Sequence, residues 1–142
     1  MKTTLLISFI ATLTLLSGCG APEKADIHDQ PAPAYTTVDV SAMELEGLTA
    51  HLKTLKTEIE RSTQTQAFGE MHYQEVALTA TLNALSPLLP ENSKTQTETL
   101  IAEIKPIAIK LHIAGHDQTA TIAKKIGEKL SSQIDQLLGL LP

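Results

Sequence analysis

Aromatic residues and cysteine are both scarce in this sequence of 142 residues. Two Phe, two Tyr and no Trp leave a hydrophobic core to be built almost entirely from aliphatic side chains. The single cysteine cannot form an internal disulfide bond, so a disulfide-stabilised fold is excluded. Covalent haem is excluded as well, because the C-x-x-C-H motif that supplies the thiols for its thioether bonds is absent.

Sequence motifs of the common enzyme classes are also missing. There is no G-x-S-x-G, no G-x-x-x-x-G-K-[ST] and no H-E-x-x-H. A di-iron helical bundle would need E-x-x-H, which does not occur either. We therefore expect a protein without enzymatic activity. The formal net charge of −5 argues further against a protein held by charge on nucleic acid or on anionic lipid.

The first nineteen residues, MKTTLLISFIATLTLLSGC, have the layout of a secretory signal. Lys2 gives a positive start, an apolar run extends from Leu5 to Leu16, and small residues follow. The last four residues, which end at Cys19, resemble the lipobox of bacterial lipoproteins. This resemblance implies removal of residues 1–18 and a membrane anchor of lipid chains on Cys19. The alternative is an ordinary signal peptide that contains a cysteine.

The residues after the lipobox indicate in which membrane the protein is anchored and where its folded domain begins. Gly20, rather than Asp, follows Cys19, and by resemblance to lipoproteins of bacteria with two membranes this favours the outer membrane, facing the periplasm. Residues 19–38 include three prolines and have no apolar period, which is typical of a flexible tether. The remaining residues, 39–142, are predicted to form one domain.

Four segments of this domain have apolar residues at helical spacing. Alternating steps of three and four connect Leu45, Leu48, Leu52, Leu55 and Ile59 in the first segment, which we expect to begin near Ser41. Similar stripes lie within residues 71–85, 100–114 and 123–141. Gly115 and Asp117 predict the end of the third helix and the start of the fourth. The pattern predicts an all-α fold, an antiparallel up-down-up-down four-helix bundle.

Two stretches carry a resemblance to a known family. MHYQEVALTATLNALSPLLP would be the second helix, and LHIAGHDQTATIAKKIGEKL would cross the third-to-fourth turn. Together with the signal sequence, this layout resembles the cytochrome c-prime type of bundle over about residues 40–142. The resemblance implies the fold. It does not imply a covalently bound haem, because the last helix, IGEKLSSQIDQLLG, has neither Cys nor His.

Three histidines are predicted to meet at one end of such a bundle. The first-to-second and third-to-fourth turns lie at the same end, which places His72, His112 and His116 there. Imidazole binds zinc and copper, and the thioether of Met71 favours Cu(I). We therefore predict a transition-metal site for Cu or Zn, with these histidines as ligands and Met71 as an auxiliary ligand. His51 is not expected to join them.

A simpler interpretation of the same residues stays open. Histidines at helix ends often interact only with the terminal carbonyl groups and the helix dipole. With a break at Gly115, His112 and His116 also need not share a helical face. In that case the protein would be a structural or protein-interaction module with no small ligand, and the leucine stripes would allow a homodimer.

Overall fold

The computed structural model describes residue 26 and residues 29–142, and in these residues it contains helices but no strand. The expected signal peptide, residues 1–18, and the lipidation site Cys19 lie outside the described residues. Four α-helices follow one another, and they are α1 (Leu45–Thr65), α2 (Phe68–Leu85), α3 (Lys94–His116) and α4 (Ala120–Leu138). The described part of the chain also includes two short 3-10 helices, η2 (Ala34–Thr36) and η3 (Ser86–Leu88). The prediction of an all-α fold is confirmed.

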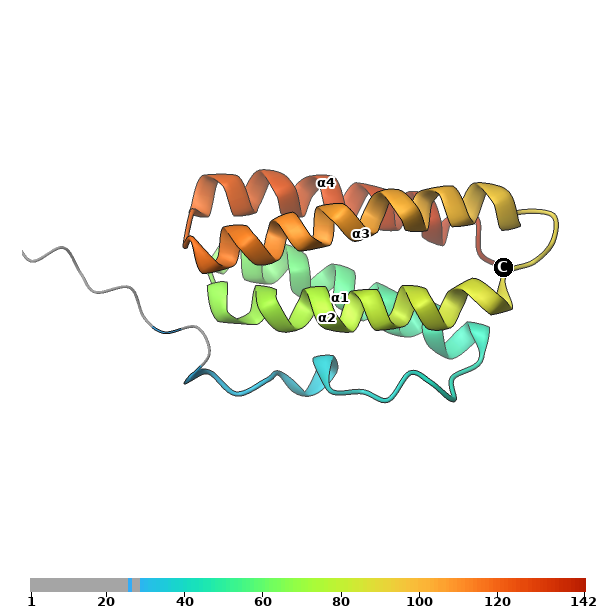
Figure 1. The fold of residues 1–142 in the computed structure, drawn as a ribbon, viewed down its shortest axis with the longest axis horizontal. Helices are drawn as coiled ribbons and strands as arrows, with labels where there is room; N and C mark the ends of the chain where they lie inside the picture. The colour runs from blue at the N-terminus through green and yellow to red at the C-terminus, as the bar shows by residue number, and fades with distance from the viewer. Residues whose placement is uncertain (1–25, 27–28) are drawn as a thin grey trace, which may run out of the picture.

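The four helices lie side by side along the length of the molecule (Figure 1). Helix α2 packs against α1 and α3, and α4 packs against the same two helices. The connections from α1 to α2 and from α3 to α4 lie at one end, on the left of Figure 1, and the longer α2-to-α3 connection lies at the other. The two short connections therefore bring the start of α2 and the end of α3 together.

The core between the helices is aliphatic, as the shortage of aromatic residues predicts. In α1 the residues of the expected stripe from Leu48 to Ile59 are fully buried. They meet Leu78 and Leu82 of α2 and residues of α3 and α4 in a single cluster. Each buried aliphatic side chain of this size contributes about 1.5–3 kcal/mol. None of the helices in the described part of the chain is long and apolar enough to cross a membrane.

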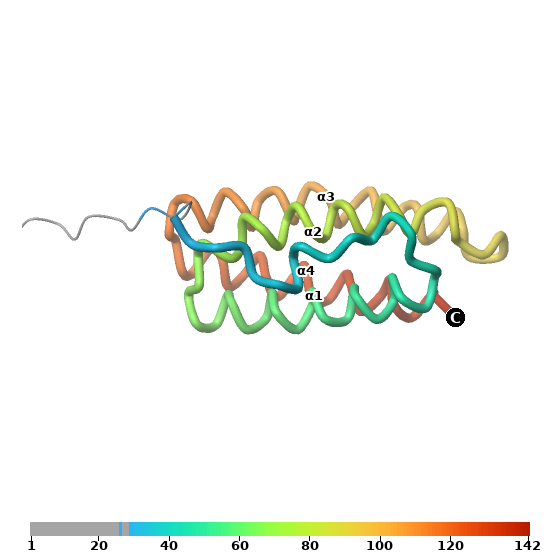
Figure 2. Tube along the Cα trace, turned by 90° about the horizontal axis from the view of Figure 1, so that it is seen from below, coloured from blue at the N-terminus to red at the C-terminus, as the bar shows by residue number. Residues whose placement is uncertain are grey.

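The last part of the expected tether packs along the helices (Figure 2). The hydroxyl of Tyr35, in η2, donates a hydrogen bond to Glu70 at 2.8 Å and accepts one from Gln74 at 2.8 Å. Buried Gln74 in turn accepts a bond from Ser62 of α1 at 2.9 Å. Further along, the Tyr73 hydroxyl donates to the backbone oxygen of Gln30 at 2.9 Å. Residues 30–36 are therefore held against α1 and α2.

The two short connections are made without glycine at their left-handed positions. Gln66, after α1, and Gln118, after α3, have φ of 59° and 49°. Gly115 instead lies inside α3 and is buried. A Cβ atom at this position would lie 2.9 Å from the backbone oxygen of Phe68 and 3.1 Å from Cβ of Met71. The prediction that α3 ends at Gly115 was wrong, because this glycine serves the close approach of α3 to the first turn of α2.

A Gly115→Ala substitution is expected to lower the free energy of unfolding by about 1–3 kcal/mol, since the added methyl group must push the two backbones apart. Urea denaturation followed by circular dichroism measures this. Gly47→Ala is the matched control, because a Cβ there would meet only Met43 at ordinary contact distance, 3.6 Å. The control should be neutral or slightly stabilising. Equal stability of Gly115→Ala and the parent protein would contradict the close approach.

His51, in the second turn of α1, is 8% exposed, and burial lowers its pKa from the ordinary value of 6.5. The unfolded chain therefore takes up a proton at this residue at a higher pH than the folded chain does. The free energy of unfolding should fall as the pH drops below about 6.5. We expect this fall to be smaller in a His51→Leu variant, measured by urea denaturation at a series of pH values. Parallel pH curves for the two proteins would refute this role.

Candidate metal centre

Three histidines converge where the start of α2 meets the end of α3. His72 lies in the second turn of α2, and His112 and His116 lie in the last turns of α3. Because α3 continues unbroken to His116, the two histidines are four residues apart on one helical face. Their rings stack at an interplanar angle of 19°, with centroids 4.8 Å apart. The continuous helix therefore provides the shared face that a break at Gly115 would have removed.

His72 meets this pair from the neighbouring helix. Its Nδ1 lies 3.1 Å from Nε2 of His112, and the two rings are nearly perpendicular, at 85°. The ring centroids of His72 and His116 are 6.0 Å apart. One nitrogen from each of the three rings can be chosen so that all three atoms lie within 4.8 Å of one another. In the described residues this is the single group of three or more His, Cys, Asp or Glu side chains with such an arrangement.

These distances suit a single metal ion. Two nitrogens bound to zinc at 2.0–2.1 Å and at the tetrahedral angle lie about 3.3–3.4 Å apart. The His72–His112 distance of 3.1 Å is already close to this value. His116 is exposed, whereas His72 and His112 are half-buried. Because the ring of His116 is exposed, it can change its rotamer toward the other two nitrogens without displacing the packed core.

A carboxylate behind His112 was not anticipated from the sequence. Glu75, one turn after His72 in α2, has its Oε2 3.4 Å from Nδ1 of His112. The other oxygen of Glu75 accepts a hydrogen bond from Thr79 at 3.2 Å. A carboxylate oxygen accepts, so the tautomer of His112 that fits this contact carries its proton on Nδ1 and leaves the lone pair on Nε2. That lone pair faces His72, so Nε2 is the ligand atom that this arrangement presents.

The carboxylate–histidine pair is the usual outer layer of a protein metal site, since it fixes the tautomer and the orientation of the ligand ring. The sequence signal for it is weak, because Glu75 and His112 are 37 residues apart in the chain. Only the pairing of α2 with α3 joins them. With His112 in this form, Nδ1–H of His72 donates to it when no metal is bound, and binding of an ion through Nδ1 would use the other neutral tautomer of His72, with the proton on Nε2.

Met71 lies in the core with an exposed fraction of 0%. Its sulfur is 3.5 Å from the point that a Cβ of residue 115 would occupy. It thus fills the space beneath the α3 backbone. Its coordination of a metal ion stays a prediction. His51 lies in the second turn of α1, away from the end where the other three histidines meet.

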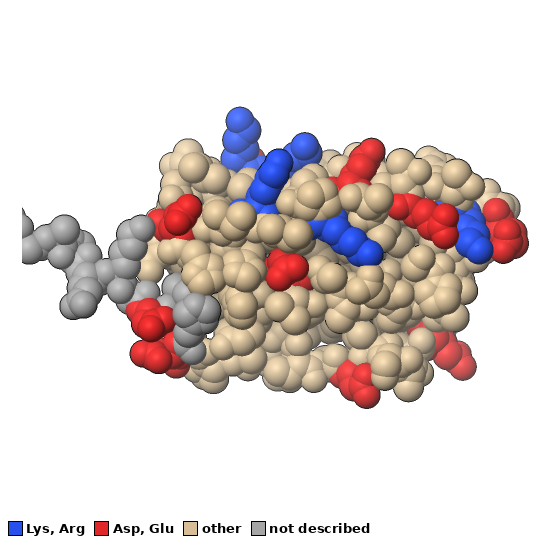
Figure 3. Space-filling view, in the orientation of Figure 1, with Lys and Arg blue, Asp and Glu red and all other residues tan. Residues whose placement is uncertain are grey.

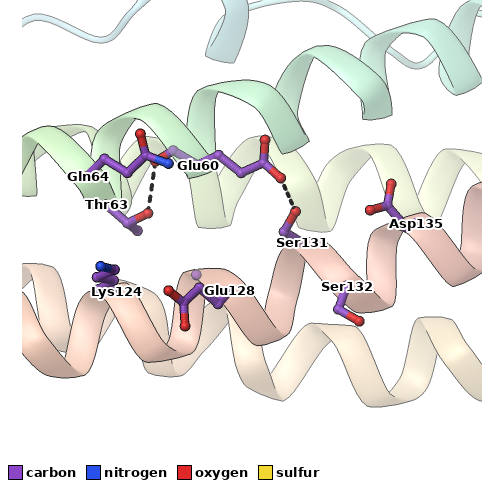
Figure 4. A pocket seen from close by; sticks show the side chains of 9 residues that line it. Glu60, Thr63, Gln64, Lys124, Glu128, Ser131, Ser132 and Asp135 are labelled. Carbon is purple, nitrogen blue, oxygen red and sulfur yellow. Dashed lines mark hydrogen bonds between the residues drawn. The ribbon is translucent and has the colours of Figure 1, made fainter.

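A groove lies on the surface between α1 and α4, away from the histidine cluster (Figure 4). It is a polar groove of about 360 Å³, lined mainly by Glu60, Ser131, Asp135 and residues around Gly127. The Glu60 carboxylate accepts one hydrogen bond, from Ser131, and pairs with Lys56 at 3.1 Å. These contacts, the Ser131 hydrogen bond first, lower the pKa of the Glu60 carboxyl. The groove is therefore lined by a polar network that connects the two helices.

Comparisons with known proteins do not place this chain in a family. Searches against protein-family models, curated proteins and solved structures gave no match. The resemblance to the cytochrome c-prime type of bundle and to the lipobox therefore stays a prediction. A function has to be inferred from the residues themselves.

Substitution of Glu75 is expected to weaken zinc binding without unfolding the protein. Glu75→Gln, which retains a neutral acceptor, should lower the affinity about 10-fold, and Glu75→Ala up to about 100-fold. Calorimetric titration with Zn(II) measures both. Glu98→Gln, on the exposed side of α3, is the control for the change in charge and should bind like the parent protein.

Nuclear magnetic resonance of the imidazole nitrogens reports which ring nitrogen of His112 carries the proton. Loss of Glu75 would leave this tautomer unchanged if the carboxylate served only the packing of the helices. In the zinc-loaded parent protein, His112 should carry its proton on Nδ1 and bind through Nε2. In Glu75→Ala this preference should weaken. Unchanged affinity and an unchanged tautomer in both Glu75 variants would show that the carboxylate does not position His112.

Proposed function

We propose that this protein is a lipid-anchored, non-enzymatic protein of the bacterial cell envelope that binds a transition metal ion through His72, His112 and His116. The observation that carries the metal proposal is the convergence of three imidazoles from two helices within 4.8 Å. The four packed helices, with their short connections, are interpreted as an up-down-up-down antiparallel bundle. This bundle is the scaffold that presents the ligands.

The chemistry of the donors favours particular metals. Three neutral imidazoles suit Zn(II), Cu(II) and Ni(II), and by the usual order of stability Cu(II) binds most tightly to a given nitrogen site. Cu(I) is favoured by soft sulfur ligands. Because Met71 is fully buried in the core, we propose the three nitrogens as the ligand set and a packing role for this methionine.

A site with three protein ligands leaves one position of a tetrahedral ion for water or an outside ligand. The exposure of His116 supports access from solvent. Such a site suits uptake, storage or transfer of an ion, because an incoming donor can bind before the imidazoles leave. We therefore propose a metal-binding accessory role, with the ion as cargo.

The anchor part of the proposal rests on the lipobox-like residues that end at Cys19. With Gly20 after the cysteine, we propose an outer-membrane location facing the periplasm. A lone cysteine is accounted for by lipidation, since an exported protein with one thiol has no disulfide to form. Several acyl chains on one residue give firm anchoring, as each buried methylene contributes about 0.8 kcal/mol.

Metal titration of the purified chain tests the metal proposal. Calorimetry with Cu(II), Zn(II) and Ni(II) should give binding of one ion per chain, and a variant with all three histidines changed to alanine should lose it. Circular dichroism should show the same helix content in both. His28→Ala is the control for removal of a single imidazole elsewhere in the chain, and it should bind normally.

The contrary result favours the interaction module. If the parent protein and the triple variant bind all three metals equally weakly, the histidines interact only with the helix ends.

A mass measurement of protein extracted from membranes tests the anchor separately, because acylation of Cys19 adds a defined mass and Cys19→Ala prevents it. An unmodified mature chain would remove the anchor from the proposal and leave the metal site unaffected.

A further inference from the structure

Positive charge is concentrated in one part of this acidic protein. Residues 105–129 contain five lysines and only two acidic residues, a formal charge of +3, whereas the other 6 basic and 14 acidic residues of the chain carry −8. This stretch covers the second half of α3 and the first half of α4, which pack together. In Figure 3 the blue lysine side chains gather over these two helices, and most of the acidic ones lie elsewhere.

An apolar groove lies within the same region. It has a volume of about 320 Å³ and is lined chiefly by Ile113 and Ala114 of α3 and Ile122 and Ile126 of α4, with Lys110 at its edge. Asp117 and Thr119, in the connection, close one end of it. Ile113 and Ile122 are 53% and 52% exposed, which is unusual for residues of this size in an otherwise well-buried aliphatic core.

Helical spacing places further lysines beside these isoleucines. Lys125 and Lys129 lie three and seven residues after Ile122, on the same side of α4, and both are exposed. On α3, Lys110 is three residues before Ile113. We name this set of Lys110, Ile113, Ile122, Lys125, Ile126 and Lys129 the lysine–isoleucine face.

The chain also leaves the helices at this end of the molecule. Gln30 lies against Gly69 and Tyr73, at the start of α2, which is the end that contains the histidines and the α3-to-α4 connection. Cys19 precedes Gln30 by eleven residues, which can span at most about 36–40 Å. The width of two packed helices is about 20–24 Å. An anchor at Cys19 can therefore reach around the molecule to the side on which the lysine–isoleucine face lies.

We propose that the lysine–isoleucine face rests on an anionic lipid membrane. This inference relies on the proposed lipid anchor at Cys19. Lysine stems can extend toward acidic headgroups while the isoleucines enter the boundary of the acyl region, which is how amphipathic surfaces bind at an interface. The acidic remainder of the chain is repelled by the same headgroups, so the domain takes one orientation. The three-histidine site, at the same end, is then held close to the membrane surface.

Single-cysteine labelling of the full-length, lipidated chain tests this. Acylation blocks the thiol of Cys19, so a cysteine introduced at Ile113 or Ile122 is the one reactive thiol and accepts a polarity-sensitive fluorophore. Thr57→Cys is the matched control, because Thr57 is exposed on α1, which packs against α2 and α4 and lies diagonally across the four helices from α3. Each labelled protein is placed in vesicles of phosphatidylethanolamine with phosphatidylglycerol, and in vesicles of phosphatidylcholine alone.

The expected result is a blue shift and a several-fold rise in emission at positions 113 and 122 in the anionic vesicles, and no change at position 57. Lys125→Glu combined with Lys129→Glu should abolish the shift while the protein stays attached to the vesicles. Equal emission at all three positions in both kinds of vesicle would overturn the proposal. So would a shift that appears in detergent without lipid and grows with protein concentration, since it would assign the face to a second copy of the chain.

The same experiments distinguish an error in the proposed lipid anchor from an error in the proposed membrane contact of the lysine–isoleucine face. If the chain lacks acyl groups by mass and does not float with vesicles, the proposed anchor at Cys19 is wrong. If it is acylated and floats, but the fluorophores at positions 113 and 122 remain in water, only the proposal for the lysine–isoleucine face is overturned.

Discussion

The close contact between Gly115 of α3 and the first turn of α2 determines the geometry of the histidine end. Because residue 115 has no side chain, the backbone of α3 can lie against the Phe68 carbonyl and the Met71 side chain. Helix α3 then runs on for another residue as a regular helix, to His116. The separation and the register of α2 and α3 follow from this contact, and the register decides which side chains of the two helices face each other.

Three consequences of this register concern metal chemistry. His72 of α2 comes opposite His112, His116 adds a third ring one turn further along, and Glu75 lies behind His112. Two rigid helices, rather than a loop, hold these groups, which is the arrangement that keeps a ligand set ordered before the ion arrives. The polar contacts among Tyr35, Gln74 and Glu70 fasten the N-terminal segment to the other side of α2. The same end of the molecule is therefore tied to the part of the chain that leads to Cys19.

The helices could be predicted from the sequence, and so could the end at which the histidines meet. Steps of three and four between leucines determine where α1 lies, although Ser41 bonds to Asp39 and α1 begins only at Leu45. The role of Gly115 could not be predicted, since a glycine near the end of a helix is compatible both with the end of that helix and with close contact to a neighbouring helix. Only the position of the neighbouring helix distinguishes the two. Glu75 was missed for the same reason, because its partner is contributed by another helix.

X-ray absorption spectroscopy of the zinc-loaded protein tests the central claim most directly, since it counts the atoms bound to the ion and identifies their type. The account predicts three imidazole nitrogens at about 2.0–2.1 Å and one further light atom from solvent. A sulfur neighbour at about 2.3 Å would contradict it. A shell of oxygen atoms with the outer scattering of no more than one imidazole ring would contradict it as well, because the ion would then be bound elsewhere on the surface.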